Sequence, residues 1–251
     1  MNRTGVVVQA RIGSSRLPGK VLMAIGPRTV LAHVIERCRA IEGSDVVCCA
    51  VPEGAADDPV AAEAVRAGAR VFRGSPSDVL DRYAGAAAML GLEVILRVTA
   101  DCPLIDPALC ADVLALRRRG GFDYACNNAP PSWPHGLDCE AITATWLQRS
   151  ARDAALPWER EHVTPYVRSH PAASRANLAM PGAGASHHRW TLDNERDLAF
   201  FRELWPRLPA GEDGWRWQTV LAIADADPAL CALNAGQDRY EGLKKSMEQA
   251  A

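Results

Sequence analysis

A loop rich in glycine, serine and cations is the part of this sequence best suited to bind phosphates. It spans residues 11–20 (RIGSSRLPGK) and follows the apolar run at residues 5–8 (GVVV). In α/β proteins, a buried strand that opens into such a loop presents backbone amides and cations to the phosphates of a nucleotide. The loop therefore predicts a triphosphate site. The alternative is a surface turn that happens to carry basic residues.

The loop does not match the P-loop pattern. That pattern has four residues between its glycines and a serine or threonine after its lysine, whose hydroxyl holds magnesium. Here five residues separate Gly13 from Gly19, and Val21 follows Lys20. We expect no helix to begin at Lys20, because residues 21–25 (VLMAI) are short and apolar and a Gly-Pro pair follows them. Any triphosphate must therefore be bound in another way.

Two aspartates follow predicted strands and suit a divalent metal. Asp101 follows the mostly apolar residues 94–98 after Thr99 and Ala100, and Asp193 comes at the end of the predicted strand at residues 188–192. Open α/β sheets bind ligands at the carboxyl ends of their strands, and carboxylates there can hold Mg²⁺ to phosphate oxygens. Asp193 alone reads as a helix cap, but its pairing with Asp101 favours a metal site. Asp106, which precedes a proline, is predicted to be a cap.

Strands and helices alternate in the first half of the chain, which predicts a mostly parallel sheet covered by helices. Two of the helices begin with an Asp-Pro pair, in which we expect the aspartate to cap the free amides. The predicted strands are residues 5–10, 45–51, 69–73, 93–98 and 123–127, and the predicted helices are residues 30–41, 59–67, 78–90 and 107–118.

The pattern changes after the turn-rich residues 127–134 (NNAPPSWP). A short strand, a helix, a further strand and two helices follow. We expect the polar C-terminus to fray. The predicted elements are strands at residues 138–143 and 187–192 and helices at residues 146–154, 195–205 and 217–224.

Composition narrows the class of protein. The chain has 251 residues, 48% of them hydrophobic and 23% charged, so we expect one domain with a subdomain. A formal net charge of −2 gives no general attraction for nucleic acid. The eight cysteines contain no C-x-x-C pair, which favours reduced thiols in a cytoplasmic protein without zinc. Neither a signal peptide nor a membrane span is expected, so we predict no membrane partner.

Four blocks of sequence resemble one enzyme family. Residues 9–20 (QARIGSSRLPGK) are similar to the signature loop of the sugar-acid cytidylyltransferases, the group of the CMP-sialic acid and CMP-3-deoxy-manno-octulosonate synthetases. Residues 97–105 (RVTADCPLI), 159–166 (EREHVTPY) and 189–193 (RWTLD) extend the similarity in the same order. The branch that the chain resembles most is named after spore coat polysaccharide biosynthesis.

The resemblance implies a fold and a reaction. The fold is a three-layer, Rossmann-like α/β fold with a mixed, mostly parallel sheet of the nucleotide-diphospho-sugar transferase type. Residues 1–251 form one nucleotidyltransferase domain, in which residues 128–186 serve as an acceptor-binding and dimerisation subdomain of a homodimer. A hydroxyl of a sugar or sugar acid attacks the α-phosphorus of CTP with Mg²⁺ as cofactor. Pyrophosphate leaves, and the CMP-sugar serves surface polysaccharide or glycan biosynthesis.

The resemblance also implies roles for single residues. The catalytic residues are Arg11, Lys20, Asp101 and Asp193, of which Asp101 and Asp193 hold the metal. The nucleotide-binding residues are Ala10, Arg11, Gly13, Ser14, Arg16, Lys20, Gly74, Ser75, Asp78, Arg82, Arg97 and Asp101. The acceptor-binding residues are His135, Asp138, Glu140, Arg160, Glu161 and His162, and Arg168 is a further candidate for an acceptor carboxylate.

Simpler roles compete with some of these assignments. Asp78 can equally be the cap of the helix that follows it. The run Glu-Arg-Glu-His at residues 159–162 also reads as an exposed helical face of neighbouring opposite charges. Two other functions compete as well. A glycosyltransferase of the same fold is disfavoured, because the chain lacks a D-x-D metal motif at Asp101. A nucleotide-binding subunit without turnover is the third hypothesis.

Overall fold

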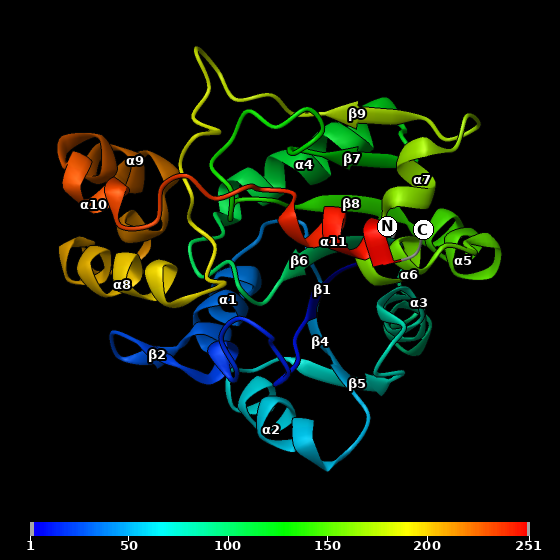
Figure 1. Cartoon of the computed structure of the whole chain (residues 1–251). Coiled ribbons are helices and arrows are strands. Elements are labelled where there is room, and N and C mark those ends of the chain that lie inside the picture. Colours follow the sequence, from blue (N-terminus) through cyan, green and yellow to red (C-terminus); the bar gives the residue numbers. More distant parts are fainter. Residues whose placement is uncertain (1–2, 250–251) are drawn as a thin grey trace.

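Seven strands form one sheet in the order β5-β4-β1-β6-β8-β7-β9 (Figure 1). The computed structural model describes residues 3–249. Strand β8 is antiparallel to β6 and β7, whereas the other strand pairs are parallel. The mixed, mostly parallel sheet predicted from the sequence is therefore confirmed. The strands are β1 Thr4–Gln9, β4 Val46–Pro52, β5 Arg70–Gly74, β6 Val94–Thr99, β7 Tyr124–Cys126, β8 Glu140–Thr143 and β9 Arg175–Asn177, and β2 Ala24–Ile25 pairs with β3 Arg28–Thr29 in a separate hairpin.

Helices cover both faces of the sheet. Successive residues of a strand point to opposite faces, and in this sheet the residues on both faces are apolar. In β1, Val6 and Val8 pack in one buried cluster and Val7 in another. The first cluster includes helices α1 Val30–Arg39, α2 Asp58–Arg66 and α4 Pro107–Gly120. The second includes α3 Val79–Leu90, α5 Ala144–Asp153 and α7 Pro165–Ser169. These layers confirm the three-layer fold.

A third apolar cluster lies beside the sheet and surrounds the fully buried Trp190. Helices α8 Glu195–Leu204, α9 Trp217–Ala226 and α10 Pro228–Ala232 supply much of it. Leu104, from the loop after β6, packs in the same cluster as Leu192. This packing fixes the segment before Asp193 next to the end of β6.

The C-terminal residues return across the front of the sheet. Helix α11 Glu241–Gln249 lies in front of β6 and β8 in Figure 1 and packs against α6 Pro157–His162. The sequence predicted a frayed end here, and this prediction is wrong for the described residues. The shorter helical turns are η1 Lys20–Leu22, η2 Ala55–Asp57, η3 Trp205–Arg207 and η4 Glu212–Trp215. None of the helices within residues 3–249 has the length and apolar character to cross a bilayer.

The predicted strand at residues 187–192 is the clearest error in the element assignments. This segment forms a single bridge, between Arg189 and His135, and no regular strand. Its backbone bonds go to loops instead, as when the Leu192 N–H donates to the Asp101 carbonyl at 2.8 Å. A run of suitable residues becomes a strand only when another strand lies alongside it.

The two Asp-Pro helix starts differ from each other. Asp106 accepts hydrogen bonds from the N–H groups of Ala108 and Leu109 at 2.8 and 3.1 Å, as a cap does. Helix α2 begins one residue earlier than predicted, at Asp58, and the Asp58 carboxylate pairs with Arg73 at 2.9 Å instead of capping. The prediction of a cap is confirmed at Asp106 and wrong at Asp58.

Candidate active site

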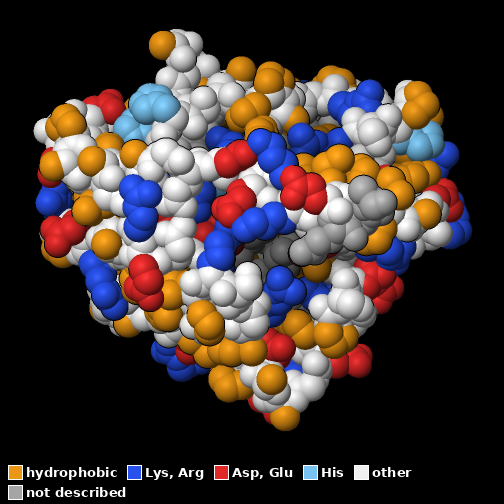
Figure 2. Space-filling view, viewed as in Figure 1, with side chains coloured by type: hydrophobic (Ala, Val, Ile, Leu, Met, Phe, Trp, Pro, Cys, Tyr) orange, Lys and Arg blue, Asp and Glu red, His pale blue; other side chains and the backbone are white. Residues whose placement is uncertain are grey.

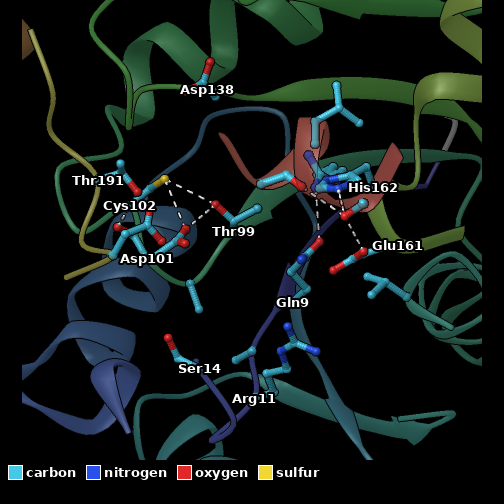
Figure 3. Close-up of a pocket in the computed structure, with 18 of the residues that line it drawn as sticks. Gln9, Arg11, Ser14, Thr99, Asp101, Cys102, Asp138, Glu161, His162 and Thr191 are labelled. Atoms are coloured by element: carbon cyan, nitrogen blue, oxygen red, sulfur yellow. Dashed lines mark hydrogen bonds between the residues drawn. The ribbon is translucent and has the colours of Figure 1, made fainter. Parts of the chain in front are cut away.

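A cavity of about 510 Å³ opens where β1 and β6 end. Figure 2 shows basic and acidic side chains gathered at the centre of this face of the molecule. Because β1 and β6 are parallel, with Gln9 opposite Thr99, the loops that follow them begin side by side. One half of the cavity is lined by these loops, and the other by β8, α6 and the C-terminal residues (Figure 3).

The first loop is held in shape by backbone bonds and by one distant carboxylate. The Gly19 N–H donates to the Ile12 carbonyl at 3.0 Å, and Gly19 has a φ of 72°, which glycine adopts at little cost. The Ile12 N–H donates to Asp57 Oδ1 at 2.6 Å. A single 3₁₀ turn, η1, follows at Lys20–Leu22, and the first α-helix begins only at Val30, so no α-helix begins at Lys20, as expected. Sequence analysis had missed Asp57.

Lys20 lies between the two predicted metal ligands. Its Nζ donates to Asp101 Oδ2 and to Asp193 Oδ1, each at 2.8 Å. Arg16 also pairs with Asp193, at 3.0 Å. Burial opposes the charge of Lys20, but the two carboxylates outweigh it and raise the pKa of Lys20. Burial likewise opposes the charge of Asp101, and Lys20 holds the Asp101 pKa below its usual range.

Neighbouring groups fix both carboxylates. The Thr99 hydroxyl donates to Asp101 Oδ1 at 2.6 Å. On the other side, Arg189 donates to Asp193 at 2.9 Å and to the fully buried Asp197 at 2.8 Å. The backbone N–H of Asp193 also donates to Asp197, at 2.9 Å. The two carboxylates therefore keep their positions when the cation between them changes.

The donor set fits a divalent ion that also binds phosphate. Asp101 and Asp193 already hold one cation between them, the ammonium group of Lys20. Within residues 3–249, no group of three or more His, Cys, Asp or Glu side chains is arranged to hold a metal by itself. Mg²⁺ commonly takes one or two carboxylates and completes its shell with waters and substrate phosphates. The residues present therefore suit an ion that arrives with a nucleotide.

Other cations of the site are only partly paired within the described residues. Arg11 lines the cavity and has no ion pair with any residue in the described part of the chain. Arg82 is 1% exposed, and burial and the Arg11 guanidinium lower its pKa. The Nε atoms of Arg82 and Arg97 are buried and find no hydrogen-bond partner among the residues described. An anionic ligand beside Arg11 and Arg82 would reduce their mutual repulsion.

The structure places most of the predicted nucleotide-binding residues at the cavity. Ala10, Arg11, Gly13, Ser14, Arg16, Lys20, Arg82, Arg97 and Asp101 line it. Gly74, Ser75 and Asp78 do not. Asp78 caps α3 by accepting from the Asp81 N–H at 2.9 Å, and Ser75 accepts from the Asp78 N–H at 3.2 Å. The simpler interpretation of Asp78 as a helix cap is confirmed.

Glu140 stands at the centre of a buried network. It is 1% exposed. Its carboxylate accepts from Arg97, from the Tyr124 hydroxyl at 2.5 Å and from the Thr164 hydroxyl at 2.7 Å. Burial opposes its charge, and Arg97 holds the Glu140 pKa below its usual range. Glu140 touches the cavity, but its oxygens are taken, so it positions Arg97 rather than binding an acceptor.

Arg160 faces away from the cavity, which corrects its assignment to the acceptor site. Its Nε donates to Asp78 at 2.5 Å, and its NH1 donates to the carbonyls of both Ala151 and Ala154, each at 3.0 Å. Successive residues of a helix point in directions about 100° apart. Glu161 and His162, which follow Arg160 on α6, therefore reach the cavity while Arg160 ties α6 to α3 and α5.

The remaining predicted acceptor residues do line the cavity, and some of them contact residues that lie outside the sequence motifs. Asp138 pairs with Arg239. Glu161 accepts from the Ser246 hydroxyl at 2.7 Å. Mainly through burial, the pKa values of His135 and His162 are lowered. The lining residues that sequence analysis did not assign to the site include Gln9, Thr99, Asn128, Thr191, Arg239, Tyr240, Leu243, Lys245 and Ser246, and the C-terminal ones lie far along the chain from every motif.

Comparisons with known proteins agree with this geometry. A family model described as cytidylyltransferase matches residues 5–192. The spore coat polysaccharide biosynthesis protein SpsF of Bacillus subtilis (strain 168) is 34% identical over 220 residues, which are 84% of this chain and 89% of that protein. A 3-deoxy-manno-octulosonate cytidylyltransferase of Anaeromyxobacter sp. (strain Fw109-5) is 35% identical over 247 residues, which are 94% of this chain and 99% of that protein.

A solved structure carries the same fold. It is a cytidylyltransferase from Leptospira borgpetersenii serovar Hardjo-bovis (strain JB197), with a TM-score of 0.87 and 26% identity, covering 95% of this chain and 100% of its own. The glycine-rich loop at residues 11–20 and Asp101 lie within the stretch that the family model matches, and Asp193 follows that stretch directly. The chain therefore belongs to the cytidylyltransferase family and is a nucleotidyltransferase.

Proposed function

We propose that this enzyme couples CTP to a sugar acid and releases pyrophosphate, which gives a CMP-sugar for surface polysaccharide synthesis. The observation that carries the proposal is the cluster of Lys20, Asp101 and Asp193 beside the unpaired Arg11, in a cavity that continues into a second polar half. The membership of the cytidylyltransferase family supports cytosine as the base, and the relatives described above support a sugar acid as acceptor.

The cations of the first loop have separate tasks in this reaction. The guanidinium groups of Arg11 and Arg16 can each bind phosphate oxygens in pairs, which fixes the orientation of the triphosphate. Lys20 is a movable point charge that can turn from the carboxylates to the leaving pyrophosphate. This movement leaves Asp101 without its cation, while Asp193 keeps its pairs with Arg16 and Arg189. A divalent ion, when bound there, polarises phosphate oxygens and lowers the pKa of an attacking hydroxyl.

The second half of the cavity orients the acceptor. Its hydroxyl must approach the α-phosphorus opposite the departing pyrophosphate, so the acceptor lies on the side of Asp138, Glu161 and His162. Arg168 lines this half, and burial and the anionic Glu140 act in opposite senses on it, with a net rise in the Arg168 pKa. A permanently charged guanidinium suits the carboxylate of a sugar acid.

The test is a substrate matrix. The full-length enzyme is incubated with each of the four common nucleoside triphosphates, with and without Mg²⁺, and with sugar acids, neutral sugars and amino sugars, while pyrophosphate release is followed. We expect release with CTP and a sugar acid, and its loss when the metal is chelated. Absence of pyrophosphate with every pair would refute the proposal. Release with neutral sugars alone would refute its acceptor.

The assembly of the enzyme is a separate part of the proposal. Residues 128–186 supply β8 and β9 to the main sheet and α5 and α7 to its second apolar cluster, so they are continuous with the core. A homodimer formed through these residues is the assembly that we propose. Light scattering at several concentrations tests it, and a monomer at all of them would contradict it.

A further inference from the structure

The C-terminal segment, residues 238–249, covers the mouth of the cavity. It contains α11, which crosses the front of the sheet (Figure 1). Its side chains contribute to the cavity lining. Those that do so are Arg239, Tyr240, Leu243, Lys245 and Ser246. A substrate that enters the cavity therefore meets this segment.

In the nucleotide half, the carboxylate of Glu241 in this segment pairs with Arg16, a proposed phosphate-binding residue. Glu241 Oε2 accepts from Arg16 NH1 at 2.8 Å, while Arg16 NH2 pairs with Asp193 at 3.0 Å. The pair of Arg16 and Glu241 is partly exposed, with 35% and 39% of the side chains accessible. Ion pairs in such positions contribute little to stability and exchange readily. A phosphate oxygen can therefore replace the Glu241 carboxylate.

At the acceptor half, the same segment offers a hydroxyl to two predicted acceptor residues. The Ser246 Oγ donates to Glu161 Oε2 at 2.7 Å and lies 3.1 Å from His162 Nε2. Figure 3 shows Glu161 and His162 side by side at this edge of the cavity. A sugar hydroxyl would make the same two hydrogen bonds, because its proton can go to the carboxylate while its oxygen accepts from the imidazole N–H.

We propose that the C-terminal segment is an autoinhibitory cover, in which Glu241 stands in for a phosphate on Arg16 and Ser246 stands in for an acceptor hydroxyl on Glu161 and His162. Each substrate displaces one of these contacts. This inference rests on the proposed function for the identity of the ligands. The contacts of Arg239 with Asp138 and with the Trp133 carbonyl at 2.9 Å stay in place, so the segment moves about this anchor.

The first experiment uses inorganic tripolyphosphate, which probes the loop without base or sugar. We expect Glu241→Gln to tighten its binding about two- to fivefold, the range expected when an exposed ion pair no longer competes. The control is Lys244→Ala, on the same helix, where Lys244 is 61% exposed and pairs with Asp238. Unchanged binding in Glu241→Gln would show that Glu241 does not compete with phosphate. Weaker binding would show that Glu241 helps to bind phosphate. Either result would overturn the proposal.

The second experiment follows amide hydrogen exchange in residues 241–249 of the unmodified enzyme. Tripolyphosphate and CTP are expected to increase exchange there, whereas CMP, which lacks the β- and γ-phosphates, leaves it unchanged. Protection by CTP would mean that the segment closes on the nucleotide and would overturn the inhibitory role. Tripolyphosphate contains neither a base nor a sugar. Its effect on hydrogen exchange therefore tests the cover even if the proposed reaction with CTP and a sugar acid is not observed.

The third experiment concerns the acceptor. Once an acceptor is known, Ser246→Ala is expected to lower its KM about two- to fivefold without changing the binding of tripolyphosphate. A raised KM would show that Ser246 binds the acceptor instead of competing with it, which would contradict the proposal at this half.

Discussion

The two halves of the cavity use their charged residues differently. In the nucleotide half, Lys20, Asp101 and Asp193 pair with one another at the edge of the cavity, so ligands of the same charge can replace each partner. In the acceptor half, Glu140 accepts from the protein's own donors, and Arg160 lies behind the cavity wall, where it donates to the protein's own acceptors. Under the proposed function, the charges on loops after strands bind ligands, whereas Glu140 in β8 and Arg160 on the inner side of α6 hold the wall in place.

The largest effect is expected from Glu140→Gln, because it removes the charge that balances the buried Arg97. Breaking a buried ion pair by changing one partner costs about 3–5 kcal/mol of folding free energy. Urea unfolding measures this loss, with the exposed Glu42→Gln as control. Unchanged stability together with a raised acceptor KM would place Glu140 among the ligand-binding residues and remove the contrast between the halves.

Asp101→Asn should affect the reaction rather than the fold. If Asp101 holds the catalytic metal, turnover falls at least about a hundredfold, as when one group that stabilises a transition state is lost. The asparagine keeps one acceptor oxygen, for Thr99 or for Lys20, and Lys20 keeps its pair with Asp193, so we expect the melting temperature to change less than turnover does. Steady-state kinetics measure the loss, and Asp153→Asn, which lies away from the cavity, is the control. Full turnover in Asp101→Asn would refute the assignment.

Arg11→Gln tests whether the nucleotide half of the cavity binds the triphosphate through Arg11. Arg11 has no ion pair to lose among the described residues, so its replacement should leave stability unchanged. A charge-assisted hydrogen bond to a phosphate contributes about 1.5–3 kcal/mol, which corresponds to a Kd for CTP about ten- to a hundredfold weaker. Isothermal titration measures the affinity. Equal affinity for CTP would show that the triphosphate does not reach Arg11.

Arg160→Met has the smallest expected effect and tests the acceptor side. The ion pair with Asp78 and the bonds to two carbonyls are partly exposed, so we expect a loss of about 1–2 kcal/mol in unfolding free energy. The KM for the acceptor should not change, because Arg160 lies outside the cavity. An acceptor KM raised tenfold, with unchanged stability, would support the original sequence prediction that Arg160 binds the acceptor.

Local pattern predicted much of the fold and half of the site. The apolar runs before the first loop and before Asp101 became β1 and β6, and both ends reach the cavity. These predictions succeed because a strand followed by a loop is determined by residues that are adjacent in the sequence. The segment at residues 187–192 failed, although its residues suit a strand, because its neighbours in space are loops. Local preference gives extended backbone but cannot supply a partner strand.

The sequence by itself determined the strand and loop that bear Lys20, the position of Asp101 after a strand, and the family to which the chain belongs. Only the tertiary structure decided that Asp57 anchors the first loop and that Arg160 turns away from the cavity. It also decided that the C-terminal segment covers the site. These contacts join residues far apart in the chain, so they depend on how the elements pack and not on the preferences of neighbouring residues.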